Sequence, residues 1–392
     1  MRSTAGDWAG AVAALEQAVA LDSATGITPS ACHVCDDLNQ LADVYLWFDS
    51  LDAVVRTARR QLAIRDGARA PLYTVMLAEA RRGDSAAAYA WFQRLLATGT
   101  PDLVAKLTLD LRLENYPAFD RQLPQLLWAA RDQDAVNARW YYLISLRNQG
   151  RLREAESVLR GGRLPGARRP LASGPSDLVN EAILALARGD GRSAARIFAA
   201  MGPPDSLVWA PGHVARQRAW ALTLVGMARA SAGDTVSLGA LADSVEMWGS
   251  RSLYGRDRRA HHYLRGLLHV ARGEDEAGVR AFREAMHSPS LGFTRVNLEM
   301  ARALLRLGRY AEAVAALQPA LRGELDASNL YVTRTELHEL LAEAFARGGN
   351  SDSAAVHYRA VVQAWRRADP EFVARRERAQ RAWRAGRAVA RS

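Results

Sequence analysis

Lysine is almost absent from this chain of 392 residues, because Lys106 is the only lysine among 52 basic residues and the others are arginines. Aromatic residues make up 7% of the sequence, and the only cysteines are Cys32 and Cys35. Two cysteines are too few for the disulfide framework of a small secreted domain. The arginine bias reflects genome composition as readily as a polyanionic partner, so it does not by itself predict binding to nucleic acid.

Long apolar runs are also missing. No stretch approaches the roughly 18 apolar residues that would cross a bilayer. The start of the chain, MRSTAGDWAGAVAAL, lacks the charged, apolar and small-residue regions of a secretory signal. We therefore expect no transmembrane segment and take the cytoplasm as the default location.

Sequence motifs of catalysis are scarce as well. No glycine-rich phosphate loop follows a strand pattern, and there is no Gly-x-Ser-x-Gly nucleophile motif. His261, His262 and His269 lie close together in the sequence, but they lack the glutamate of a zinc-protease motif and are better explained as residues of the core or its rim. We expect no enzymatic activity, no cofactor and no metal site.

The two cysteines form a Cys-x-x-Cys pair in the stretch ACHVCDD at 31–37. A redox role would need the βαβ surroundings of a thioredoxin-like fold, and a zinc site would need four ligands, of which only His33 is near. Inert thiols or a local disulfide are the simpler interpretation. A redox or metal role shared with a partner is the alternative.

Alanine and other helix-forming residues are abundant, and strand patterning is weak. The composition, 49% hydrophobic and 24% charged, is that of a folded all-α protein. The formal net charge is +10, and nine arginines against three acidic residues give 366–392 a net +6 of that total. Such a basic tail could contact nucleic acid, but a solvated helix at the end of the chain is the simpler expectation.

A helical pattern recurs about ten times along the chain, each time broken by a turn. The predicted turns fall at Gly6, Asp49, Gly83, Tyr116, Gly150, Gly189, Gly233, Gly273, Gly308 and Gly349. The first three spacings after Asp49 are 34, 33 and 34 residues, and the later ones run from 35 to 44. Repetition at this period predicts a stack of helix–turn–helix units.

Small residues keep a fixed register around these turns. Five residues after the turn stand Ala11, Ala88, Ala155, Ala194, Ala313 and Ala354. Seven residues before it stand Ala42, Ala182, Gly226, Gly266, Ala301 and Ala342, and nine residues after it stands a large residue such as Phe92, Phe198 or Phe282. We expect the small residues to let two helix backbones approach and the large ones to fill the groove beside them.

These features resemble the tetratricopeptide repeat (TPR), a helix–turn–helix unit of 34 residues, over essentially the whole chain. The clearest units are 69–96, 294–321 and 335–365, and Tyr45 and Phe345 match the aromatic residue of the family's first helix. The family's tryptophan and most of its prolines are not in register. The resemblance implies an all-α, right-handed α-solenoid whose first helices line a concave groove.

The resemblance also suggests how the chain is divided. The glycine- and proline-rich stretches at 161–176 and 201–213 are predicted loop insertions between units. We expect one superhelix over 1–365, with about nine helix pairs after a leading half-repeat, and a basic capping helix or tail over 366–392. A half-repeat at the start leads us to expect a chain that is cut from, or begins late in, a longer protein.

Three phrases in the C-terminal half, SRSLYGRDR, GFTRVNLEMARALL and SNLYVTRTELHELLAEAF, carry a second resemblance. They resemble the repeat regions of large bacterial signalling proteins, in which a serine/threonine kinase or a winged-helix transcriptional activator precedes the repeats. Neither effector domain is present in this sequence, so neither activity can be transferred to it.

The first helices of a TPR groove carry the positions that face a ligand. The resemblance places a candidate set of partner-binding residues there: Tyr73, Trp140, Arg147, Asn148, Arg295, Arg302, Arg306 and Glu339. A row of arginines beside apolar residues suits a peptide with acidic side chains. The alternative is that these arginines pair with glutamates of the adjacent helix. With one lysine in the chain, a lysine clamp on a C-terminal carboxylate is not expected.

Two similar phrases, SLYGR at 252–256 and NLYVTR at 329–334, each precede a predicted first helix. Their tyrosines and arginines, Tyr254, Arg256, Tyr331 and Arg334, either cap and staple the next helix or bind a ligand. We favour the structural role.

Together these observations predict a non-catalytic scaffold that binds a peptide or protein partner, as the docking or sensory region of a bacterial signalling protein. The alternative is the regulatory repeat region of a DNA-binding activator or kinase, with the basic tail adding contacts. Binding of nucleic acid by the repeats alone is not expected. The identity of the partner and the oligomeric state stay open.

Overall fold

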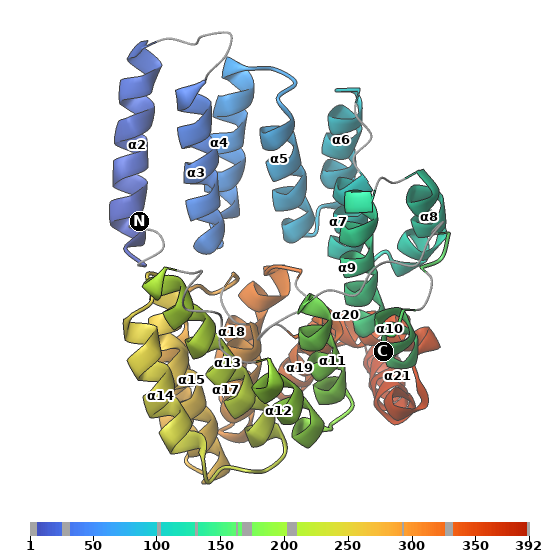
Figure 1. Ribbon diagram of the computed structural model, residues 1–392. Coiled ribbons are helices and arrows are strands. Elements are labelled where there is room, and N and C mark those ends of the chain that lie inside the picture. Colours follow the sequence, from blue (N-terminus) through green and yellow to red (C-terminus); the bar gives the residue numbers. More distant parts are fainter. Residues whose placement is uncertain are drawn as a thin grey trace. The chain divides into compact units, whose positions relative to one another are not determined.

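The computed structural model describes residues 6–25, 32–99, 103–129, 132–161, 164–166, 175–201, 210–291, 294–325 and 332–389. Every regular element in these ranges is a helix. The contacts divide the chain into unit 1, residues 1–138, and unit 2, residues 139–392, with the division inside helix α9. Each unit is described by itself (Figure 1).

Unit 1 contains one leading helix and three helix pairs. The helices are α2 (Trp8–Thr25), α3 (His33–Trp47), α4 (Leu51–Ile64), α5 (Arg69–Arg82), α6 (Ser85–Leu96), α7 (Leu103–Arg112) and α8 (Tyr116–Ala129). The pairs are α3 with α4, α5 with α6 and α7 with α8.

Unit 2 continues the same arrangement from α9, which begins just before the division. Its pairs are α9 (Asp132–Asn148) with α10 (Leu152–Leu159), α11 (Pro175–Ala187) with α12 (Gly191–Ala200), α13 (Pro211–Ser231) with α14 (Leu238–Ser250), α15 (Gly255–Ala271) with α16 (Asp275–Ala285), α17 (Thr294–Arg306) with α18 (Tyr310–Arg322), and α19 (Arg334–Arg347) with α20 (Ser351–Ala364). The short helices η1 (Trp365–Arg367) and η2 (Pro370–Phe372) then lead into α21 (Val373–Val389).

The predicted turn positions adopt the left-handed conformation that ends a helix, with one exception. The eight glycines among them have φ between 66° and 89°, and Asp49 has φ 60°. The exception is Tyr116, which begins α8, because the left-handed residue is Glu114 with φ 53°. The prediction at Tyr116 was therefore two residues late. No glycine marks this turn, which closes instead where the Asn115 amide donates to the Asp110 carbonyl at 2.8 Å.

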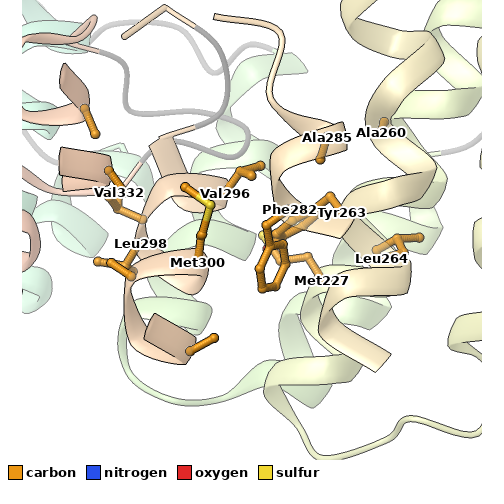
Figure 2. Close-up of a cluster of buried hydrophobic side chains, with 14 of the residues drawn as sticks. Met227, Ala260, Tyr263, Leu264, Phe282, Ala285, Val296, Leu298, Met300 and Val332 are labelled. Carbon is orange, nitrogen blue, oxygen red and sulfur yellow. The ribbon is translucent and has the colours of Figure 1, made fainter. Parts of the chain in front are cut away.

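The small residues of the repeat are contact points between helices, as predicted. The six alanines five residues after a turn are at most 4% exposed. A Cβ added to Gly266 would lie 2.5 Å from the ring of Phe282, and one added to Gly226 would lie 2.7 Å from a methyl of Leu264. Phe282 and Leu264 lie in the hydrophobic cluster of unit 2 (Figure 2). Larger residues at these glycines would overpack the helix contact.

The two predicted loop insertions overlap the starts of helices. Helix α11 begins at Pro175 and α13 at Pro211, so the predicted loops 161–176 and 201–213 extend a little too far. Proline is well suited to the first turn of a helix because it has no amide proton to leave unpaired there. Most of the remainder of both stretches lies outside the described residues.

The fold class predicted from the sequence, an all-α stack of helix–turn–helix units, is confirmed within the described residues. The basic C-terminal segment is helical as α21, and Trp365, Phe372 and Ala379 are at most 7% exposed, which anchors its start on α20. A single superhelix over 1–365 with 366–392 as its cap stays a prediction.

Candidate functional site: an arginine-lined hollow in unit 2

Unit 2 surrounds a hollow of about 870 Å³. The helices that line it include the first helices α9, α11, α13, α17 and α19, together with α20 and α21. The charged residues in its lining are Arg147, Arg295, Arg302, Arg306, Arg347, Arg375, Arg378, Glu336, Glu339 and Glu343. Seven arginines against three glutamates leave the wall with a clear excess of positive charge.

Helix α17 supplies the centre of this wall. Its lining residues Arg295, Leu298, Arg302, Leu305 and Arg306 are spaced by three, four, three and one, so they share one face of the helix. Leu298 and Leu305 are 1% and 3% exposed, whereas the side chains of Arg302 and Arg306 remain 44% and 47% exposed. The face thus presents solvent-accessible guanidinium groups above a row of packed leucines.

Most of these arginines already contact a carboxylate. Arg302 donates to Glu299 of its own helix at 2.9 Å, and Arg306 holds Asp275 of α16 with both Nε and Nη2, at 3.0 and 2.7 Å. The two arginines are nearly half exposed, whereas Glu299 and Asp275 are only 18% and 16% exposed. A carboxylate of a ligand can therefore approach the exposed side of each guanidinium beside its existing partner.

These pairs bear on the alternative interpretation from the sequence, in which the arginines pair with glutamates of the adjacent helix. Arg302 and Arg306 do pair with carboxylates, but the partners are a residue of the same helix and one of the preceding second helix. The sequence predicted that the arginines of α17 pair with the glutamates of α19. Arg375 of α21 makes such a pair instead, because its guanidinium Nε donates to Glu339 at 3.1 Å. The glutamates of α19 are thus partly occupied by α21.

Arg295 stands apart from the other arginines of α17. Its Nε is buried and has no hydrogen-bond partner among the described residues. Burial acts to raise the pKa of nearby Glu336, but the charge of Arg295 and the hydrogen bonds of Thr333 outweigh it, so that this pKa is lowered. Glu336 therefore stays ionised, and its Oε2 accepts from the Thr333 amide in the capping box at the start of α19.

Apolar and hydroxyl groups complete the lining. Ile183 is buried, and Leu186 of α11, Leu340 of α19 and Tyr358 of α20 are partly exposed to the hollow. Burial, with a smaller contribution from Glu343, raises the pKa of Tyr358, so its phenol stays neutral and can donate a hydrogen bond. This mixture of cations, apolar surface and a neutral donor can bind carboxylates that are attached to apolar groups.

The hollow gathers five of the eight residues proposed from the sequence. They are Arg147, Arg295, Arg302, Arg306 and Glu339. Register alone identified them, because each lies on the inner face of a first helix.

The other three proposed residues lie elsewhere. Tyr73 is in unit 1 and packs partly buried against the cluster of Leu72 and Met76. Asn148 is 3% exposed and uses its side chain within the protein, donating to the Ile144 carbonyl at 2.9 Å and accepting from the Arg334 amide at 2.8 Å. Trp140 is partly exposed on α9 and does not appear in the lining of the hollow.

Sequence reasoning missed several lining residues, chiefly Ile183 and Leu186 of α11, Tyr358, and Arg375 and Arg378 of α21. The repeat register of the Gly189 unit could have pointed to the first two. Nothing in the local pattern places α21 in the wall, because its position depends on how the whole of unit 2 curves.

The remaining candidate groups do not line the hollow. Cys32 and Cys35 form a disulfide at the start of α3. His261 is buried, His262 pairs with Glu284 at 3.0 Å, and His269 pairs with Glu274 at 2.6 Å. These positions confirm the prediction that the three histidines belong to the core and its rim. Within the described part of the chain, no cluster of three or more metal-binding side chains is found.

Tyr254, Arg256 and Arg334 make contacts within the protein. Arg216 stacks on Tyr254 at 4.1 Å, and Arg256 stacks on Trp220 at 4.7 Å. The guanidinium of Arg334 donates to a backbone carbonyl of α18. The expected capping of the next helix is not seen at Tyr254, which is the N-cap residue of α15 and makes no side-chain cap hydrogen bond. Tyr331 lies outside the described residues.

Comparisons with known proteins add no family. No protein-family model matches the sequence, and no curated protein matches it. Among solved structures, a tetratricopeptide repeat protein from Parabacteroides merdae is similar at 11% identity over 90% of this chain and 98% of that one, with a TM-score of 0.35. Yeast Tom70 is similar at 13% identity over 91% of this chain and 89% of its own, with a TM-score of 0.33. The TPR domain of P58(IPK) is similar at 14% identity over 98% and 96%, with a TM-score of 0.26. Membership of the tetratricopeptide family thus stays a proposal from the sequence.

Proposed function

We propose that this protein is a non-catalytic scaffold and that the hollow of unit 2 binds an acidic segment of a protein partner. The observation that carries the proposal is the composition of the wall. Seven arginines, three glutamates and a row of leucines surround about 870 Å³. A wall of this kind attracts carboxylates and offers apolar surface to the side chains between them.

The availability of the arginines supports this proposal. Arg302 and Arg306 are close to half exposed, so each guanidinium keeps an accessible side beside its present carboxylate partner. Arg295 lies in the same wall and adds a third positive charge to this face of α17. A neutral peptide would gain no ion pair with these arginines.

The wider setting of this scaffold is part of the proposal. The phrases of the C-terminal half suggest the docking or sensory region of a bacterial signalling protein. Among the described residues, no helix has the length and apolar character needed to span a membrane. The cytoplasm stays the default location, although a disulfide such as Cys32–Cys35 is more common in oxidising compartments.

Charge reversal at Arg302 tests the proposal. The probe is a fluorescein-labelled peptide of alternating glutamate and leucine, with the glutamine version as the uncharged control. We expect Arg302→Glu to weaken binding on the order of 30-fold, because it places a carboxylate against the ligand. Fluorescence anisotropy at physiological salt measures the affinity.

Arg283→Glu is the matched control for this experiment. Arg283 pairs with Glu312 at 2.7 Å and its side chain is 51% exposed, so it resembles Arg302 in pairing and exposure but lies on α16, outside the hollow. Equal losses in the two variants, or equal binding of the glutamine peptide, would refute capture in the hollow.

The DNA-binding alternative makes a different prediction. Duplex DNA should bind with steep salt dependence, and the arginines of the C-terminal tail should carry that dependence. Salt-tolerant binding of the acidic peptide together with weak, non-specific DNA binding would favour the scaffold.

A further inference from the structure

The turn between α9 and α10 contacts parts of unit 2 that are far away in the sequence. The side-chain oxygen of Asn148 accepts from the Arg334 amide at 2.8 Å, and its carbonyl accepts from the Thr335 hydroxyl at 2.6 Å. These contacts join the first and last helix pairs of unit 2 across more than 180 residues. The helix pairs of unit 2 therefore form a closed arrangement, because the first pair, α9 with α10, is bonded at this turn to the last pair, α19 with α20.

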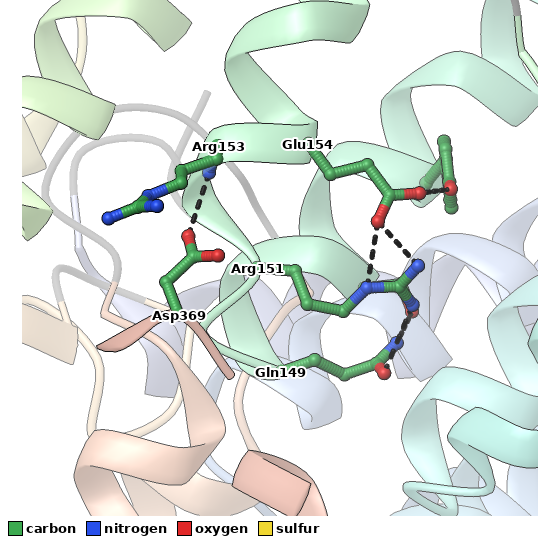
Figure 3. Close-up of polar contacts among 7 residues, drawn as sticks. Gln149, Arg151, Arg153, Glu154 and Asp369 are labelled. Carbon is green, nitrogen blue, oxygen red and sulfur yellow. Dashed lines mark hydrogen bonds and ion pairs between the residues drawn. The ribbon is translucent and has the colours of Figure 1, made fainter. Parts of the chain in front are cut away.

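A second set of contacts joins the same turn to the segment after α20. The Asp369 amide donates to the Gly150 carbonyl at 2.9 Å. The Asp369 carboxylate accepts from the Arg153 amide at 2.8 Å, as Figure 3 shows. Arg153 is the second residue of α10, whose own N-cap residue, Arg151, provides no side-chain cap. Asp369 thus caps α10 from 216 residues further along the chain.

Shape complementarity accompanies these hydrogen bonds. Gly150 has φ 66°, and a Cβ added there would lie 3.0 Å from the Cβ of Ala368 and 3.1 Å from the ring of Phe372. The segment therefore sits directly on the turn.

The same segment continues into the wall of the hollow. Arg375 stacks on Trp365 at 4.6 Å and pairs with Glu339, and Arg378, Ala379 and Ala382 of α21 line the hollow. One continuous stretch, residues 365–385, thus holds the α9–α10 turn at one end and forms a side of the hollow at the other.

We propose that residues 365–385 are a strap that closes unit 2, and that its release from the α9–α10 turn admits the acidic segment to the hollow. The part concerning admission rests on the proposed function, and the part concerning release does not. The Asp369 hydrogen bonds and the packing of Ala368 and Phe372 on Gly150 hold the strap at the turn, and Trp365 holds its start on α20. Loss of the Asp369 carboxylate removes the hydrogen bond to α10 and so weakens the hold on the turn.

Removal of the Asp369 carboxylate tests the release. Asp369→Ala should speed amide hydrogen exchange about fivefold, the effect of one lost cap, both in the α10 start and in the strap. The matched control is Asp190→Ala, which removes an equivalent cap, since Asp190 accepts from the Ser193 amide at 2.9 Å within its own turn. We expect this control to speed exchange in α12 alone. Faster exchange in α10 with an unchanged strap would overturn the release.

Association of the glutamate–leucine peptide tests the admission. Stopped-flow fluorescence should show association about fivefold faster with Asp369→Ala, because the open form is more populated, and an unchanged rate with Asp190→Ala. Binding at equal rates to wild type and Asp369→Ala would overturn the gating while the proposed function stands. Absence of binding to all three proteins would overturn the proposed function and the admission together, whereas the exchange experiment still decides the release.

Discussion

Units 1 and 2 are built from the same helix pairs, but the Lys106–Asp110 pair of unit 1 and the arginines of the hollow in unit 2 differ in how far their charges are exposed. In unit 1, the single lysine of the chain pairs with a buried carboxylate. Lys106 Nζ lies 2.5 Å from the carboxylate of Asp110, which is fully buried. This carboxylate also accepts from the Tyr89 hydroxyl at 3.0 Å. In unit 2, Arg302 and Arg306 keep nearly half of their side-chain surface in the hollow.

This difference shows how one repeat can serve two purposes. The small residues and turns fix the helix contacts in both units and say nothing about a ligand. The charged residues are fixed less strictly, so Lys106 and Asp110 stabilise the interior of unit 1, whereas Arg302 and Arg306 remain exposed in the hollow of unit 2. Charge in unit 1 should therefore matter for folding, and charge in the hollow should matter for binding.

The largest expected effect comes from breaking the buried pair of unit 1. Lys106→Met leaves the Asp110 carboxylate buried without its cation, which should lower the free energy of unfolding by about 3 kcal/mol. Lys106→Arg, which keeps the charge, should lose much less. Urea denaturation followed by circular dichroism measures both variants. A loss below about 1 kcal/mol in Lys106→Met would mean that the pair is not structural.

The next effect is a dependence on pH that belongs to unit 2. Burial, followed by the charges of Arg259 and Arg256, lowers the pKa of His287 from 6.5 to about 4. Between these values the unfolded chain binds a proton that the folded chain does not, so the free energy of unfolding falls as the pH drops. At about pH 5 the loss should be about 1 kcal/mol, reduced because the ring is partly exposed. His287→Gln should flatten this slope in urea denaturation at about pH 7.5 and about pH 5, and an unaltered slope would contradict the assignment.

A smaller effect separates two aromatic residues of unit 2. Tyr358 lines the hollow, whereas Trp140 was proposed from the sequence and does not. Tyr358→Ala should weaken binding of the glutamate–leucine peptide about fivefold, and Trp140→Ala by less than about twofold. Anisotropy titrations of the two variants give the comparison, and the reverse order would favour the groove face predicted from the sequence over the hollow.

The smallest effect is expected from the exposed arginines of the C-terminal helix. Arg381 and Arg384 are exposed on α21 outside the lining of the hollow. The double variant Arg381→Glu/Arg384→Glu should change peptide affinity by less than about twofold at physiological salt, because screening limits its long-range effect. If the same variant abolished tight, salt-sensitive binding of duplex DNA by the wild type, the DNA-binding alternative would gain over the scaffold.

Local features of the fold were predictable because they depend on neighbouring residues. Gly266 and Gly226 mark close approaches between helices, and the left-handed glycines mark the ends of helices, wherever the repeat occurs. The turn at Glu114 was placed two residues late, because a glutamate in the left-handed conformation cannot be recognised from the sequence as a glycine can. Arginines on α17 were predictable for the same local reason, since they share one helix face.

The rest of the site depends on distances that no local pattern encodes. Arg375 and Tyr358 reach the hollow because small rotations between successive helix pairs bring α20 and α21 beside α17 and α19. Asn148 was proposed as a ligand contact because its register is that of Arg306, two residues before the turn glycine. It joins the first and last pairs of unit 2 instead, which becomes visible only when the unit closes.

The most direct test of the account is to map where an acidic peptide lies. A glutamate–leucine peptide carrying a photoactivatable leucine analogue is cross-linked to the full chain, and the adducts are located by mass spectrometry. Capture in the hollow predicts adducts on the inner faces of α11, α17, α19 and α20, at residues such as Leu186, Leu340 and Tyr358. Adducts mainly on α16 and α18, or in unit 1, would contradict it.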